Sequence, residues 1–325
     1  MFFIFKHDKK ICYDNSYDLK YRILGEKRRL IMGKPIKRYL KINEQVEHLK
    51  EEKMQISDEE FAKSILSRVN YYHLSGYWHT LYSENKEFIP GTTFEQVHHL
   101  YQFDCELRFL ITELLKDLEI KFKAHIANYI GDKWGPLGYR DISNFYDEDT
   151  HINFLSILNK KKKQYKKKPF VKHHIDYYDG KLPIWAVVEI LSFSDVTSFY
   201  RAFHESDRKK LIKKNYTGNW DIINNSTETP NWIKTLCDIR NKCAHYERLY
   251  NARLANSIKL PERYSDYNIK TNKLFSALII LTLLVDDENM KLNFIDDLRD
   301  LFKKYNFVDI QVMGFPDNWD GILKA

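Results

Sequence analysis

Glycine and proline, the residues that most often interrupt helices and form tight turns, are scarce in this sequence, with 11 and 8 among 325 residues. This scarcity disfavours β-sandwiches and β-barrels, whose short strands need frequent turns. Charged residues make up 30% of the chain and hydrophobic residues 43%, which is enough for a substantial core beneath polar helix faces. We therefore expect an all-α fold, arranged as one large domain or two smaller ones.

Cysteine is also scarce, with four residues scattered along the chain. No two of them form a C-x-x-C pair, so the sequence predicts neither a disulfide framework nor a structural zinc site. Free thiols are typical of a reducing compartment. The histidine pairs His98–His99 and His173–His174 lack further ligands at metal-binding spacing, and we expect no metal and no cofactor.

Long hydrophobic stretches are lacking as well. The longest strongly apolar run, Leu274 to Val285, is about half of the roughly 20 residues that a membrane-spanning helix needs. Met1 to Lys6 includes an apolar patch, but not the basic region, longer apolar stretch and cleavage site of a signal peptide. We expect a cytoplasmic protein with no membrane partner, in which Leu274 to Val285 is a buried helix.

The spacing of apolar residues predicts helices over most of the chain, after a basic and irregular extension at residues 1–33. We expect a helical domain over residues 34–261 and a C-terminal helical segment, 262–325, packed on the same domain. The expected helices are two within 46–69, the second preceded by a capping box at Ser57 to Glu60, then Phe94–Ile130, a helix from about Asp149 into a lysine-rich run, Val196–Phe203, Asp207–Lys213 and Asn231–Tyr250.

Two segments have more than one interpretation. Tyr71 to Trp78 gathers aromatic residues around Gly76 and is either a helix end or a turn, with its aromatic side chains either in the core or free to stack on bases. Ile184 to Phe193 follows Pro183, which suits the first turn of a buried helix, but the segment is short and β-branched, so a strand is the alternative.

Positive charge is concentrated in one stretch. The net charge is +7, and seven of the nine residues from Lys160 to Lys168 are lysines, followed by Lys172. Such a run can neutralise several phosphates and give binding that depends steeply on salt. The alternative is a solvated, mobile loop, because blocks of like charge repel each other. Aromatic residues reach 15%, more than a helical core needs, which favours some surface positions that stack on bases.

The clearest chemical motif is Arg240-Asn241-Lys242-Cys243-Ala244-His245, within the helix predicted at Asn231–Tyr250. A histidine can move protons near neutral pH, an arginine can hold a phosphate with two hydrogen bonds, and an asparagine can orient either of them. Cleavage of RNA by its own 2′-hydroxyl needs these residue types and no obligatory metal. By spacing alone the motif is weak evidence, because an Arg-Asn pair followed by a His often occurs by chance on a polar helix face.

Other blocks strengthen the assignment of this motif. Ile239 to Asn251 resembles the signature of the Abi-like abortive-infection family (the AbiD and AbiF group) of the HEPN superfamily. Tyr71 to Trp78 resembles the family block GYYRLSGYW, with Asn70 and His73 in place of its glycine and arginine. Tyr101 to Ile120 resembles the family's YxFD, LR and IE helix. Leu182 to Phe193 resembles its LPIWAVVE and SFG block, with Ser194 in place of glycine.

The resemblance covers about residues 34–261 and implies a HEPN-like helical bundle that dimerises, cleaves RNA and arrests growth in phage defence. It also implies association with a structured small non-coding RNA in a toxin–antitoxin-like arrangement, and kinship with type VI CRISPR nucleases. The family's catalytic residues fall on Arg240, Asn241 and His245. The candidate RNA-binding residues are Lys160, Lys161, Lys162, Lys163, Lys166, Lys167, Lys168, Lys172, Arg108 and Tyr77.

Three alternatives stay open at this point. Arg108, Glu119 and Lys123 either orient the catalytic helix, face RNA or form a buried ion pair. The chain is either a nuclease or a protein that holds a cognate small RNA with its catalysis absent or masked. A third interpretation is a helical antitoxin-like partner that acts through protein contacts alone.

Overall fold

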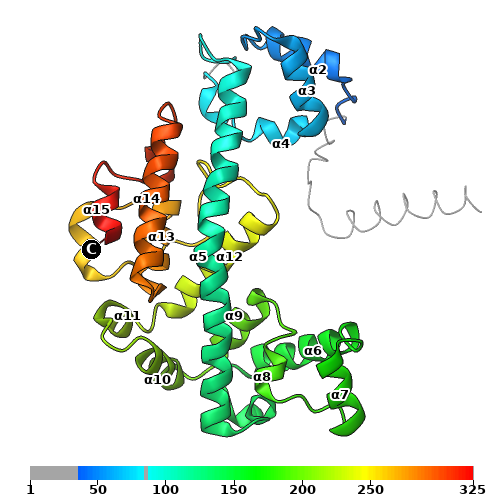
Figure 1. The fold of residues 1–325 in the computed structure, drawn as a ribbon, viewed down its shortest axis with the longest axis vertical. Helices are drawn as coiled ribbons and strands as arrows, with labels where there is room; N and C mark the ends of the chain where they lie inside the picture. Colours follow the sequence, from blue (N-terminus) through cyan, green and yellow to red (C-terminus); the bar gives the residue numbers. More distant parts are fainter. Residues whose placement is uncertain (1–35, 84–86, 325) are drawn as a thin grey trace, which may run out of the picture. The chain divides into compact units, whose positions relative to one another are not determined.

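The computed structural model of the chain describes residues 36–83 and 87–324 (Figure 1). The described residues fall into two units, the first ending at Glu44 and the second beginning at Gln45. In the first unit, Arg38 Nη1 and Glu44 Oε1 form an ion pair of 2.8 Å. The expected basic extension at residues 1–33 lies outside the described residues.

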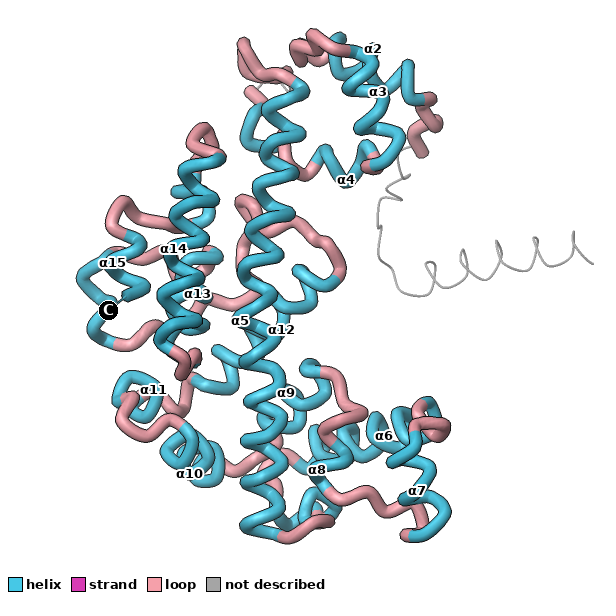
Figure 2. The backbone as a smooth tube through the Cα atoms, viewed as in Figure 1, coloured by secondary structure: helices cyan, strands magenta, loops and turns pink. Residues whose placement is uncertain are grey.

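The described residues are mostly helical and include no β-strand, as Figure 2 shows; three isolated bridges are their only β pairing. This confirms the predicted all-α fold. The α-helices are α2 (Ile42–Glu51), α3 (Glu59–Arg68), α4 (Tyr71–Ser75), α5 (Phe94–Trp134), α6 (Glu148–Gln164), α7 (Pro169–Tyr177), α8 (Ile184–Val187), α9 (Phe193–Arg201), α10 (Glu205–Asn215), α11 (Trp220–Asn224), α12 (Thr229–Ala244), α13 (Leu274–Leu284), α14 (Glu288–Lys304) and α15 (Trp319–Lys324).

The second unit is built around α5, a helix of 41 residues. A capping box begins it, in which the Thr93 hydroxyl accepts from the backbone of Gln96 and the Gln96 side chain accepts from the backbone of Thr93. The helix ends before Gly135, whose φ of +79° suits glycine. The long helix predicted at Phe94–Ile130 is confirmed and extends to Trp134. In Figure 1, α12 and α14 lie beside α5, which makes residue contacts with both.

The capping box predicted at Ser57 to Glu60 is wrong in its position. Asp58 is the residue that caps α3, and its side chain accepts a hydrogen bond of 2.8 Å from the backbone N–H of Phe61. Ser57 donates instead to Glu95 at the start of α5, at 3.0 Å. An aspartate caps as well as a serine does, so the helix begins one residue later than the pattern predicted.

The two open segments are both helical. Tyr71 to Ser75 forms the short α4, capped by the Asn70 side chain and ended at Gly76. Ile184 to Val187 forms the short α8 after Pro183, and the strand interpretation of this segment is wrong. Its continuation turns and then enters α9, where the side chains of Ser192 and Asp195 form a second capping box.

The lysine-rich run lies at the end of α6. Lys160 to Lys163 belong to the last turns of this helix, where positive charge complements the helix dipole. Lys166 to Lys168 form the connection to α7, which begins at Pro169. The prediction of a helix that ends in the lysines is therefore confirmed.

The apolar run near the C-terminus is the buried helix α13, in which every residue from Leu274 to Leu284 is buried, as predicted. It makes contacts with α12, α11 and α15, while α14 packs on α5. Within the described part of the chain, no helix combines the length and the hydrophobicity that crossing a membrane requires.

Candidate active site

The three predicted catalytic residues lie at the C-terminal end of α12. Arg240 and Asn241 are in its last turns and partly exposed, while His245 is exposed and follows Ala244, the last residue of the helix. The expected helix at Asn231–Tyr250 is thus too long by six residues. The structure confirms the part of the predicted helix up to Ala244, and a proline lies in its first turn.

α12 ends in a Schellman motif, in which the backbone N–H of Glu247 donates to the carbonyl of Lys242 at 2.8 Å and that of Tyr246 to Cys243 at 3.2 Å. Tyr246 occupies the left-handed position with φ +58°. Glycine is usual at that position, and its absence here explains why the pattern predicted a longer helix. His245 is the residue that caps the C-terminus of the helix, and its backbone has φ −98° and ψ 10°.

Arg240 is oriented by the long helix. Its Nε lies 2.9 Å from Oε2 of Glu119, a buried residue of α5. The other carboxylate oxygen of Glu119 accepts from Lys123 Nζ at 2.8 Å. Arg240 Nη1 also lies 3.4 Å from the side-chain oxygen of Asn241. Nη2 has no hydrogen bond to any described residue, so part of the guanidinium is available to an anion.

The Asn241 side chain is bound to α9 and not to the His245 ring, although the His245 backbone N–H donates to the Asn241 carbonyl at 2.9 Å. Its amide donates to Ser194 Oγ at 3.0 Å, and that hydroxyl lies 3.3 Å from Cys237 Sγ. The sequence suggested that Asn241 orients the histidine or the phosphate; the structure instead connects it to Arg240 and Ser194. Ser194 is a site contact that sequence reasoning did not identify.

The His245 side chain forms no hydrogen bond with any described residue and is exposed. Its ring can therefore approach a ligand from solvent. Cys243, two residues earlier, is buried, and burial raises the pKa of its thiol to about 11. The thiol stays protonated at neutral pH, which excludes it as a nucleophile beside the histidine.

A buried network fixes the chain after α12. Asp104 of α5 accepts hydrogen bonds from the backbone N–H groups of Leu249 and Tyr250, at 3.1 and 2.7 Å. Its carboxylate also accepts from the Tyr77 hydroxyl at 2.8 Å and forms an ion pair with Arg108. Burial raises the pKa of Asp104, and the Arg108 guanidinium and these hydrogen bonds oppose that shift.

Two of the predicted RNA-binding residues belong to this network, and their burial disfavours direct contact with RNA. Arg108 is 4% exposed and Tyr77 is 0% exposed, so neither side chain can reach RNA here. Arg108 Nη1 also approaches the carbonyl of Glu247 at 3.4 Å. Of the three alternatives for Arg108, the buried ion pair is confirmed. The partner in that pair, Asp104, was missed because a buried carboxylate has no local sequence pattern.

The lysine-rich run and the motif meet at the first turn of α9. Lys161 Nζ lies 3.6 Å from Asp195 Oδ2, and the neighbouring Ser194 binds Asn241. Lys162 donates to the carbonyl of Gly180, and Lys172 pairs with Asp176. Within the run from Lys160 to Lys168, the exposed lysines that form no ion pair with any described residue are Lys160, Lys163, Lys166, Lys167 and Lys168. Lys168 instead lies 4.7 Å from the centre of the Tyr165 ring.

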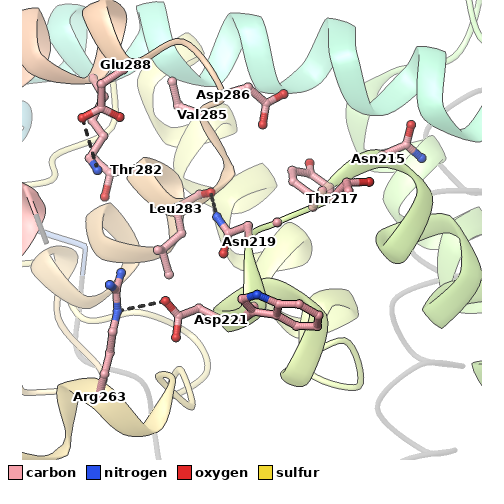
Figure 3. A pocket seen from close by; sticks show the side chains of 14 residues that line it. Asn215, Thr217, Asn219, Asp221, Arg263, Thr282, Leu283, Val285, Asp286 and Glu288 are labelled. Atoms are coloured by element: carbon pink, nitrogen blue, oxygen red, sulfur yellow. Dashed lines mark hydrogen bonds and ion pairs between the residues drawn. The ribbon is translucent and has the colours of Figure 1, made fainter.

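A cavity of about 670 Å³ lies elsewhere in the second unit, and Figure 3 shows the side chains that line it. An ion pair of 3.0 Å between Arg263 Nε and Asp221 Oδ2 lies on one side of it. None of the predicted site residues lines this cavity. Its charged lining residues are the carboxylates Asp221, Asp286 and Glu288 against Arg263 and Lys291, a balance that disfavours a polyanion.

Metal ligation has no support in the described residues, among which no group of three or more His, Cys, Asp or Glu side chains could hold a metal ion. The α12 end instead offers a partly free guanidinium at Arg240 and an exposed imidazole at His245. These groups can bind a phosphate and transfer a proton.

A comparison with known protein families gives a match. The family model described as Abi-like protein matches residues 64–251, which is more than half of the chain. The matched interval contains Asp104, Glu119 and Ser194 as well as the motif on α12. The comparisons with curated proteins and with solved structures gave no match.

Proposed function

Because the chain belongs to the Abi-like protein family, we propose that it acts in abortive-infection defence against phage, as a HEPN-type endoribonuclease that needs no metal ion. The observation that carries this proposal is the arrangement at the end of α12. There, buried Glu119 holds Arg240 by its Nε, and the exposed His245 ring follows the helix end. A polar helix face without function needs neither a buried carboxylate partner nor a free imidazole.

The proposed reaction is attack of a ribose 2′-hydroxyl on the adjacent phosphorus. A bond forms between the 2′-oxygen and phosphorus, the bond between phosphorus and the 5′-oxygen breaks, and the products are a 2′,3′-cyclic phosphate and a 5′-hydroxyl. A general base removes the proton of the 2′-hydroxyl and a general acid gives one to the departing 5′-oxygen. His245 is the group of the motif that carries out proton transfer near neutral pH.

Arg240 is the proposed phosphate-binding residue. Glu119 lies at its Nε, and Nη2 forms no hydrogen bond with a described residue, which leaves Nη2 protons for a non-bridging phosphate oxygen. Negative charge that grows on these oxygens in the transition state is stabilised by the fixed guanidinium. Asn241 acts as a positioning residue, because its side chain links Arg240 to Ser194 on α9.

Each chain supplies one motif histidine, while the reaction uses both a base and an acid. We propose a homodimer that brings two α12 ends together, because a twofold axis places the same histidine of the second chain in the site. The exposed position of His245 at a helix end is compatible with such an approach.

RNA is held in this proposal by the lysine-rich end of α6. Lys161 approaches Asp195 at 3.6 Å, and Asp195 is adjacent to Ser194, which binds the motif residue Asn241. An RNA backbone that binds along the exposed lysines would therefore lead towards the motif on α12. Contacts of this kind position RNA without reading its sequence.

The test compares cleavage of a labelled RNA by the wild-type protein and by His245→Ala. We expect the variant to lose cleavage by at least about a hundredfold while its affinity for RNA changes less than about threefold. The matched control is His79→Ala, another exposed histidine of the second unit. Undiminished cleavage by His245→Ala contradicts the site assignment.

The substrate and the metal requirement provide a second arm. We expect cleavage to persist with a chelator, to give cyclic phosphate termini, and to stop at a site where a single 2′-deoxy nucleotide replaces the ribonucleotide. Cleavage at the deoxy position, or loss of activity with the chelator, contradicts the mechanism.

The second candidate function is a catalytically silent or masked protein that holds a structured small RNA in a toxin–antitoxin-like system. The exposed lysines without ion partners favour it, because they suit RNA whether or not the motif is active. Purification with one discrete RNA and no cleavage in any of the assays above would support this alternative. Nucleic-acid-free protein of low RNA affinity would contradict it.

A further inference from the structure

A groove lies between the end of α7 and the short α8. Its volume is about 580 Å³, and its lining includes His174, Tyr177, Tyr178, Lys181, Pro183 and Trp185. We call it the aromatic groove. None of its residues is among the predicted catalytic or RNA-binding positions, and none belongs to the motif on α12. Figure 1 shows α7 and α8 close to α6, whose lysine-rich end leads into α7.

The large aromatic side chains of this groove are exposed. Tyr177 is 74% exposed, Tyr178 is 54% exposed and Trp185 is 58% exposed. On α8 the neighbours Ile184 and Ala186 are buried, so Trp185 is the residue of this apolar run that faces outward. A cluster of exposed aromatic residues typically marks a binding surface, because burying them would stabilise the free protein.

The rings already form a partly ordered surface. The rings of His174 and Tyr178 lie 5.3 Å apart at 35°, and those of His173 and Tyr177 lie 5.0 Å apart at 41°. These are tilted contacts that leave outer ring faces open. Planar ligand groups can therefore stack on rings that need little further ordering, which lowers the entropic cost of binding.

The charges around the groove favour a polyanion. Lys162 donates to the carbonyl of Gly180, which connects the lysine-rich end of α6 to the segment between α7 and α8. The negative charges of the nearby Asp179 and Asp176 are neutralised by ion pairs, with Lys181 at 3.6 Å and with Lys172, respectively. The exposed lysines of α6 thus add positive charge beside an aromatic surface, the combination by which proteins hold single-stranded nucleic acid.

We propose that the aromatic groove binds unpaired bases of RNA by stacking on Trp185, Tyr177 and Tyr178, while the lysines of α6 hold the backbone that leads to α12. This inference rests on the proposed function, and it adds a preference for single-stranded segments. Bases inside a duplex have no free faces, so a duplex can use the lysines but not the groove. A second copy of the chain is disfavoured as the occupant, because two lysine-rich surfaces would repel each other.

The experiment measures binding of a short unstructured RNA and of an RNA duplex of the same length, by fluorescence anisotropy in the His245→Ala background. We expect Trp185→Ala to weaken binding of the unstructured RNA about tenfold and binding of the duplex less than about twofold. The matched control is Trp220→Ala, which removes a tryptophan that is 68% exposed and lines the acidic cavity of Figure 3. The control should bind both RNAs as the parent does.

Two further variants separate stacking from folding. Trp185→Phe keeps an aromatic face and should retain most of the affinity, whereas Trp185→Leu keeps bulk and should not. Thermal unfolding of each variant shows whether the fold is intact. Equal affinities of the phenylalanine and leucine variants would overturn the stacking proposal.

Other outcomes distinguish the two proposals. Parent-like RNA affinity of Trp185→Ala, with normal cleavage when His245 is present, overturns the aromatic groove and leaves the nuclease proposal intact. A parent protein that binds neither RNA overturns both. Dissociation of a dimer by Trp185→Ala overturns the groove assignment in favour of a second copy of the chain.

Discussion

At the scale of single residues, the most informative contact is the one between Glu119 and Arg240. A buried carboxylate that binds one nitrogen of a partly exposed arginine fixes the direction of the guanidinium. Lys123 donates to the second carboxylate oxygen of Glu119. A rotation of the Glu119 side chain away from Arg240 would therefore also break its contact with Lys123. The arginine is thereby oriented before any ligand arrives, and such preorganisation is a main source of transition-state stabilisation.

Glu119→Gln tests this positioning role. The amide keeps the size of the side chain but weakens the contact with Nε, so Arg240 is expected to sample other directions. We expect kcat for RNA cleavage to fall about tenfold, with KM changed less than about twofold. Glu113→Gln, which removes a surface carboxylate paired with Lys116 on the same helix, is the control. A purely structural role predicts instead a lower melting temperature with kcat unchanged in the folded fraction.

His125 gives the clearest prediction about pH. Burial, with a smaller contribution from the charge of Lys121, lowers the pKa of this imidazole to about 4, while Asp286 opposes the shift. Its Nδ1 is buried and has no hydrogen-bond partner among the described residues. The neutral ring packs edge-on against Tyr216, with 5.7 Å between ring centres.

The sign of the pH effect follows from this lowered pKa. The unfolded chain binds a proton at His125 near its ordinary pKa of about 6.5, and the folded protein does so only near 4. Stability from the neutral ring is therefore fully present above pH 6.5 and is lost as the pH falls towards 4. We expect the free energy of unfolding to drop by about 2 kcal/mol from this residue, allowing for its partial exposure. Urea unfolding at pH 7 and pH 4.5 should show a smaller drop for His125→Phe, and equal drops would contradict the assignment.

At the scale of secondary-structure elements, the lysines at the end of α6 have two opposing effects on stability. They stabilise the helix C-terminus through the helix dipole, and they repel one another. Only Lys161 approaches a carboxylate among the described residues of the run from Lys160 to Lys168. The remaining repulsion is relieved when phosphates bind.

Salt dependence measures this element directly. We expect the replacement of Lys160, Lys163, Lys166 and Lys167 by glutamine to reduce the slope of log affinity against log salt by about 0.7 for each phosphate of a single-stranded RNA that these lysines neutralise. The matched control replaces Lys209, Lys210, Lys213 and Lys214 of α10, which also lie towards a helix C-terminus. An unchanged slope in the first variant, or an equal change in the control, would remove the α6 end from the RNA surface.

Elements whose signals are local were predictable from the sequence. The long helix α5 has a clear apolar period and a threonine cap, and the buried α13 is a short, uniformly apolar run. The end of α12 was not predictable, because a tyrosine occupies the left-handed position that glycine usually takes. The candidate catalytic residues came from the resemblance of ordered blocks, since their spacing alone fits many polar helix faces.

Contacts between distant parts of the sequence were not predictable. Asp104 binds the backbone of Leu249 and Tyr250, and nothing near either segment indicates this pairing. Arg108 and Tyr77 were candidates for RNA contact and also for buried positions, and both complete the polar network around Asp104. A buried carboxylate needs hydrogen-bond donors, so the polar side chains that donate to it are buried with it.

At the scale of the whole molecule, the proposed dimer has a kinetic consequence. If two α12 ends form one active centre, a chain that lacks its histidine should inactivate the wild-type chain with which it pairs. We expect excess His245→Ala protein to suppress wild-type cleavage in proportion to the mixed dimers formed, with saturating RNA present so that competition for substrate has no effect. Activity that depends only on the amount of wild-type chain would show that one chain suffices.

The length and position of α5 impose a limit of another kind, on insertions and deletions. Asp104 and Glu119 lie on the same helix and hold the two sides of the α12 end, one through Leu249 and Tyr250 and the other through Arg240. An added or removed residue between them would rotate one anchor by about 100° relative to the other and move it about 1.5 Å along the axis. Among natural variants of this chain, the stretch from Asp104 to Glu119 should therefore change in sequence while keeping its length, and a tolerated change in length should come close to a whole number of helical turns.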